Sequence, residues 1–129
     1  MGDHNQVRYN FVAGPYTSIT ANGGERHHFV ASNSIYLTGW NTSTAPAIRM
    51  IYRDHLNTPN WGNGTTQTLF RSQEVSYLRA GQYQTLLQME VDGLKASPDS
   101  EGTYSNLADK YYDQLIYSLY LAEQYFGIS

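Results

Sequence analysis

The chain has 129 residues, 40% of them hydrophobic, and a formal net charge of −3, which predicts one globular domain over residues 1–129. It has no cysteine and no uncharged apolar run long enough to cross a bilayer, which excludes disulfides, zinc–thiolate sites and a membrane span. The net negative charge argues against a strongly basic surface that binds the phosphates of nucleic acid. Five arginines nevertheless precede most of the acidic residues and leave room for a local positive face: Arg26, Arg49, Arg53, Arg71 and Arg79.

The first part of the chain predicts a small β region. Apolar and polar residues alternate over residues 6–11, which favours a strand, and Gly14-Pro15 predicts a turn before a second short strand at 16–19. A glycine turn at 22–24 then leads into a third predicted strand at 25–31.

The next segment is polar and then apolar. Residues 33–44 are rich in Ser, Thr, Asn and Gly, which predicts a long ordered loop. Residues 46–52 form a second apolar strand candidate, and residues 53–56 predict a short helix that Pro59 ends. This helix carries His55.

Three amphipathic helices are predicted in the rest of the chain. The first begins at Thr65 or Thr66 and ends at Ala80, with Gly81 in the C′ position. The second covers 82–95, and the third covers about 104–125 with apolar residues at spacings of three and four. We therefore expect an α+β fold with a small amino-terminal β region and three carboxy-terminal helices.

The chemistry is concentrated at His27 and His28, which are adjacent at a predicted strand, and at His55 on the short helix. Metal-assisted hydrolysis of a phosphodiester needs a cation, a base and rigid ligands, and histidine serves both as a ligand and as a base near neutral pH. One residue of the pair would then bind a divalent cation, the other would act as the base, and His55 would be a second ligand.

A second interpretation of the same residues involves no catalysis. Neighbouring residues on a strand point to opposite faces, so one histidine of the pair is then buried and hydrogen-bonded while the other faces water. His55 becomes a surface residue, and Glu25 and Arg26 become a solvated ion pair of little energetic value. From residue chemistry alone, a hydrolase and a binding module are equally favoured.

The sequence Glu25-Arg26-His27-His28, followed by an apolar residue, resembles a signature of the HNH/endonuclease VII superfamily, in the nuclease toxin domains of bacterial polymorphic toxins. The similarity continues through 46–50, Asp54-His55 and Trp61-Gly62 and covers the chain from about Gly24 to its end. It implies a ββα-metal (His-Me) finger over about 24–60, with the helical region at about 65–126 behind it.

The resemblance also implies roles for individual residues. His27 and His55 are expected to hold a divalent ion (Mg, Mn, Zn or Ni), and His28 is expected to be the general base, with Glu25 as a second catalytic candidate. The phosphate of a DNA substrate is expected to contact three arginines, because guanidinium binds phosphate oxygens in pairs: Arg26, Arg49 and Arg53.

The expected biological setting also follows from the resemblance. It is a toxin module cut from a larger secreted or injected bacterial protein, acting in the target-cell cytoplasm and paired with an immunity protein. The sequence departs from the family pattern after His55, where Pro59 disturbs the helix and Asn57 or Asn60 would have to supply a further ligand. The alternative is therefore a catalytically incomplete nuclease-like domain that binds protein or nucleic acid.

Overall fold

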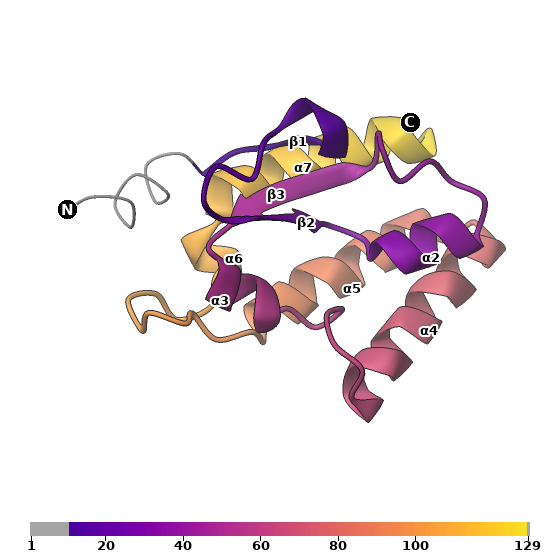
Figure 1. The fold of residues 1–129 in the computed structure, drawn as a ribbon. Helices are drawn as coiled ribbons and strands as arrows, with labels where there is room; N and C mark the ends of the chain where they lie inside the picture. Colours follow the sequence, from indigo (N-terminus) through magenta and orange to yellow (C-terminus); the bar gives the residue numbers. More distant parts are fainter. Residues whose placement is uncertain (1–10, 129) are drawn as a thin grey trace.

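A computed structural model describes residues 11–128 and has an α+β fold (Figure 1). A three-stranded antiparallel sheet occupies the first half of the chain, and helices follow it. The strands are β1 (Ala13–Pro15), β2 (Glu25–His28) and β3 (Pro46–Met50), in the order β1-β3-β2. The central strand β3 is buried at every position because it is paired on both edges, and a strand in this position has little access to water.

The amino-terminal strands differ from the prediction. Most of the strand expected at 6–11 lies outside the described residues. The turn predicted at Gly14-Pro15 is wrong, since both residues belong to β1, and the strand predicted at 16–19 is instead the 3-10 helix η1 (Tyr16–Ser18). Proline is tolerated at Pro15 because β1 is an edge strand, where one row of backbone groups has no ladder partner.

Strands β2 and β3 and the short helix α3 (Tyr52–Leu56) form near their predicted positions, but an unpredicted helix lies between the two strands, and α3 packs against β2. His27 pairs with Ile48 and His28 with Ala47 in the register. The turn before β2 requires glycine at Gly24, where a Cβ atom would lie within 2.3 Å of the Met50 carbonyl oxygen.

The loop predicted at 33–44 begins instead with the helix α2 (Ser32–Leu37). The polar composition of residues 33–44 predicted a loop, but tertiary contacts stabilise α2 as a helix. Ile35 is fully buried in the core, and the Ser34 hydroxyl donates a 2.8 Å hydrogen bond to the carboxylate of Glu74 on α4. The remaining residues, up to the start of β3, are not helical.

Helices α4 (Thr65–Ala80) and α5 (Tyr83–Lys95) agree with the prediction, and Gly81 ends α4 with the left-handed backbone expected at C′. The third predicted helix is divided into α6 (Leu107–Lys110) and α7 (Tyr112–Phe126). It also begins later than predicted, because the backbone N–H groups of Thr103 and Tyr104 bind the Asp99 carboxylate.

Helix α7 packs against β1 and β3, while α2 packs on α4, and α5 contacts α4, α6 and α7 (Figure 1). The apolar residues of β3, α5, α6 and α7 share one core, which includes Phe29, Ile35 and Tyr111. Within the described residues, no helix is long and apolar enough to cross a membrane.

Candidate functional site

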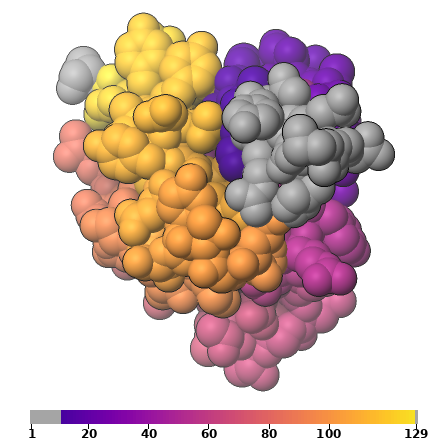
Figure 2. Space-filling view, turned by 90° about the vertical axis from the view of Figure 1, so that its left-hand side faces the viewer, coloured from indigo at the N-terminus to yellow at the C-terminus, as the bar shows by residue number. Residues whose placement is uncertain are grey.

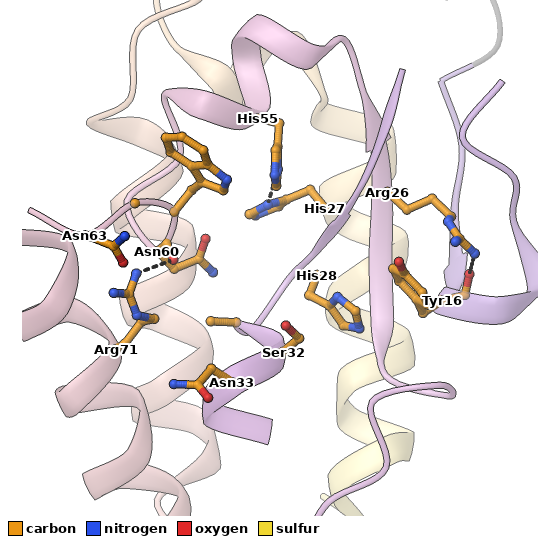
Figure 3. A pocket seen from close by; sticks show the side chains of 13 residues that line it. Tyr16, Arg26, His27, His28, Ser32, Asn33, His55, Asn60, Asn63 and Arg71 are labelled. Carbon is orange, nitrogen blue, oxygen red and sulfur yellow. Dashed lines mark hydrogen bonds between the residues drawn. The ribbon is translucent and has the colours of Figure 1, made fainter. Parts of the chain in front are cut away.

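The structure brings His27 and His55 together (Figure 3). His27 comes from β2 and His55 from α3, and their Nδ1 atoms lie 3.1 Å apart. The two rings meet edge to face, with centroids 5.2 Å apart, and His27 is 3% exposed. Two histidines that are 28 residues apart in the sequence therefore present the same ring nitrogen to each other.

The surroundings of both imidazoles favour their neutral form. Burial lowers the pKa of His27 well below its ordinary value, and the nearby His55 and His28 lower it further. Burial also lowers the pKa of His55, although the negative charge of Glu25 opposes that shift. Neutral imidazole is the form of histidine that binds metal ions.

The Nδ1–Nδ1 distance suits a shared hydrogen bond or a shared cation. A zinc ion lies about 2.0–2.1 Å from a histidine nitrogen, so nitrogens 3.1 Å apart are close enough for both to contact one such ion. Within residues 11–128, no group of three or more His, Asp or Glu side chains is placed to hold a metal ion. A metal ion at this position would therefore have two imidazole ligands from the chain, and further ligands would be amides, water or substrate.

His28 lines the same pocket but makes different contacts. Its Nε2 lies 2.9 Å from the carbonyl oxygen of Thr42, to which it donates, and its ring stacks on Tyr16 with centroids 4.2 Å apart. This hydrogen bond fixes the tautomer, so Nδ1 carries the free lone pair. Burial lowers the pKa of His28, the Thr42 hydrogen bond opposes that effect, and the charge of Arg26 lowers the pKa further. His28 is thus an oriented neutral base.

The three histidines line an open pocket of about 470 Å³. Its other walls come from the β2–α2 junction, the 60–63 loop and α4. Trp61, 43% exposed, stands at its edge with its ring centroid 6.0 Å from that of His55. The polar residues around the histidines are Tyr16, Arg26, Ser32, Asn33, Asn60, Asn63 and Arg71.

The structure separates the two asparagines considered as further ligands. Asn60 is buried and lines the pocket, and its Nδ2 lies 3.5 Å from both the Phe29 carbonyl oxygen and Glu74 Oε2. Asn57 does not line the pocket, and its Nδ2 donates to the carbonyl oxygen of Pro98. Asn60 is therefore the amide that belongs to the site.

Of the predicted phosphate contacts, only Arg26 lines the pocket. Its guanidinium stacks over the Tyr16 ring, 4.0 Å from the centroid, and donates to the carbonyl oxygens of Tyr16 and Ile19. Arg49 is buried on β3 and donates to Thr20, and it does not line the pocket.

Two other candidates lie near the pocket without lining it. Arg53 is exposed on α3. Glu25 is half-buried at the start of β2 and acts on the site through its charge, which raises the pKa of His55.

Sequence reasoning missed Arg71 as a site residue. It lies on α4, far along the chain from the histidine motif, and its guanidinium donates a 3.0 Å hydrogen bond to the backbone oxygen of Asn60. Its only sequence signal was its membership in the early arginine group. Asn33 and Asn63 were also missed as site residues, because the sequence around each of them is typical of a polar loop.

No protein-family model, curated protein or solved structure matches this chain.

Proposed function

We propose that this protein is a metal-dependent endonuclease that hydrolyses phosphodiester bonds of DNA. One observation carries the proposal: the facing Nδ1 atoms of His27 and His55 lie in an open pocket beside a third histidine of fixed tautomer. These histidines lie on β2 and α3, and β2, β3 and α3 are the three elements expected of a ββα-metal finger, with the helix α2 inserted between the two strands.

His27 and His55 would hold the divalent cation, and Asn60 is the one of the two predicted amide ligands that lines the same pocket. When bound, the ion would stabilise negative charge on the phosphate and on the leaving oxygen. Two imidazole ligands favour Zn or Ni over Mg, because hard cations prefer oxygen ligands, while Mn is intermediate.

His28 Nδ1 would take a proton from the attacking water. The water oxygen then forms a bond to phosphorus as the bond from phosphorus to the leaving sugar oxygen breaks. The contacts of His28 with Thr42 and Tyr16 hold its ring in place for this step. Arg26, which lies beside Tyr16, supplies positive charge at the same side of the pocket.

The test of the base is plasmid nicking with Mg²⁺, Mn²⁺, Zn²⁺ or Ni²⁺. His28→Ala is expected to lower the nicking rate about 10²- to 10⁴-fold, the usual contribution of a general base. His4→Ala is the matched control, since it removes a histidine outside the proposed set. Equal nicking by His28→Ala and the unaltered protein would remove His28 from the mechanism.

The test of the metal ligands is calorimetric titration with the same ions. His27→Ala and His55→Ala should each abolish the high-affinity site, whereas His28→Ala should retain it. Retention of the site in both ligand variants would contradict the assignment, whatever the nicking activity.

A second candidate function is a nuclease-like domain that binds nucleic acid or protein without cutting. It is favoured by the segment after His55, where Pro59 stands one turn beyond the ligand and the Asn57 amide is engaged with Pro98. Under this alternative, the His27–His55 contact is a hydrogen bond between neutral rings. Calorimetry would then detect no metal site, and no ion would support nicking.

The proposed biological role is that of a toxin module from a larger secreted or injected bacterial protein, acting in the target-cell cytoplasm. The proposed partner is a cognate immunity protein. Exposed aromatic residues on α7, such as Tyr112, Tyr117 and Tyr120, are of the kind enriched at protein interfaces.

A further inference from the structure

The histidine pocket adjoins a second hollow between α2 and α4. This groove has a volume of about 480 Å³, and two residues, Asn33 and Arg71, line both it and the histidine pocket. The groove is otherwise lined by short polar and apolar residues and, at the end of α4, by Arg79. The two hollows therefore adjoin at Asn33 and Arg71.

Charge is segregated along these two hollows. Three arginines line them, Arg26, Arg71 and Arg79, whereas no Asp or Glu is among their described lining residues. The whole chain carries more acidic than basic residues, so this segregation is opposite to the net charge. A path lined by guanidinium groups and free of carboxylates suits a polyanion.

The arginines are spaced along the path. Figure 3 places Arg26 and Tyr16 on one side of the histidines and Arg71 and Asn33 on the other. Arg71 and Arg79 are eight residues apart on α4, so they share a helix face and lie about 12 Å apart along its axis. This separation exceeds one nucleotide step, about 3.4 Å along a duplex strand.

Of the two described aromatic residues other than histidine that line the histidine pocket, Trp61 is exposed and Tyr16 is half-buried. Trp61 is 43% exposed at the edge of the histidine pocket. Base stacking on an exposed aromatic ring, beside a positively charged groove that follows the backbone, is the usual means of binding single strands without sequence preference. Bases paired and stacked in a duplex do not offer such a face.

We infer that the α2–α4 groove is the path of a single polynucleotide strand that leads away from the histidine pocket, with Arg71 and Arg79 on its phosphates and Trp61 on a base. The inference rests on the proposed function, because it takes the histidine pocket to receive a phosphodiester of the same strand. It assigns an unpaired strand, rather than intact duplex, as the preferred substrate.

The test is fluorescence anisotropy with labelled DNA in EDTA, which prevents metal-dependent cleavage. An oligonucleotide of about eight residues should bind more tightly than a dinucleotide and than a duplex of the same sequence. Arg79→Ala should weaken binding of the longer strand about three- to tenfold and reduce the slope of log K against log salt by about 0.7. It should leave dinucleotide binding unchanged.

Two further variants complete the test. Trp61→Ala should weaken binding of the longer strand about tenfold through lost stacking. Lys95→Ala is the charge-matched control, because Lys95 is exposed on α5 and lines neither hollow, and it should bind like the unaltered protein. Binding of an RNA strand of the same sequence tests whether the groove distinguishes ribose from deoxyribose. Tight binding of either the DNA or the RNA strand supports the groove as the path of a single strand.

The outcomes separate this inference from the nuclease proposal. Unchanged strand binding in Arg79→Ala, or duplex binding as tight as strand binding, would overturn the groove even if the protein nicks plasmid. Loss of strand binding in Arg79→Ala, without hydrolysis under any ion, would support the groove and refute the nuclease.

Discussion

Glu90 faces the core from α5 with its carboxyl group against that of Glu74 on α4. Glu90 is 2% exposed, and its Oε2 has no hydrogen-bond partner among the described residues. Burial raises its pKa well above 4.5, and the charge of Glu74 and the hydrogen bond to it raise the pKa further. Burial and the contact with Glu74 therefore favour the protonated form of Glu90. Glu74 accepts hydrogen bonds from Ser34 and from the backbone of Ala31, so the pair fixes the wall of the pocket.

Glu90→Gln is expected to change how stability depends on pH. Above the ordinary glutamate pKa, the unfolded chain loses the Glu90 proton while the folded chain keeps it, so the free energy of unfolding falls as pH rises. Gln retains a donor for Glu74 and cannot ionise. Urea unfolding should therefore show little advantage of the variant at about pH 4.5 and an advantage that grows toward pH 8.

Asp92→Asn is the control for this prediction, because Asp92 is an exposed carboxylate on the same helix. Its difference from the unaltered protein should be nearly constant over this pH range. A constant difference for Glu90→Gln as well would show that Glu90 titrates alike in the folded and unfolded chain.

Helix α3 carries His55 and is too short to be stable by itself. It is anchored through Asp54, which is fully buried and accepts hydrogen bonds from Tyr111, Ser100 and Lys110. The Lys110 ammonium also lies 2.5 Å from Asp99 and 2.8 Å from Glu101. Figure 2 shows the loop and helix that supply these groups (orange) beside α3 (magenta). The carboxy-terminal elements therefore hold a histidine of the site.

Lys110→Met is expected to destabilise the protein by about 3–5 kcal/mol, because it leaves Asp54 and Asp99 buried without their cation. Burial alone would raise the pKa of Asp99, but hydrogen bonds from Lys110 and from backbone N–H groups lower it to about 2. Urea unfolding measures the loss, and metal titration of the folded fraction should give weaker binding as α3 shifts. Lys95→Met, at an exposed position, should change the free energy of unfolding by less than about 0.5 kcal/mol.

A loss of stability below about 1 kcal/mol in Lys110→Met would mean that the network does not anchor α3. Unchanged metal affinity, together with a large loss of stability, would mean that α3 keeps its position without the ammonium.

The candidate metal site joins β2 to α3, and these elements pack in the same domain as the helices behind them. A ligand that binds only the folded chain stabilises the whole domain by mass action. At an ion concentration 100 times its Kd, the free energy of unfolding should rise by about 2.7 kcal/mol, and EDTA should reverse the rise. Thermal or urea unfolding of the unaltered protein and of His27→Ala measures the effect. Equal stabilisation of both proteins would place the ion elsewhere.

Much of the fold was predictable from local patterns. Helices α4 and α5 follow from apolar periodicity and from Gly81, β3 follows from a short apolar run, and β2 and α3 follow from the glycine turn before β2 and from Pro59 after α3. The helix α2 was not predictable, because its polar sequence becomes helical through contacts with α4 and the core. The break at Tyr111 was missed because its phenol binds Asp54 and Ile51, which are distant in sequence.

The sequence by itself determined which residues are the candidates for the chemistry, since His27, His28 and His55 stand out by type and by position. Only the tertiary structure decided which of them meet, that Asn60 and not Asn57 belongs to the pocket, and that Arg71 joins it while Arg49 is buried elsewhere. The physical reason is that residue type is a local property of the chain. Burial, facing ring nitrogens and adjoining hollows arise only when segments distant in sequence pack against one another.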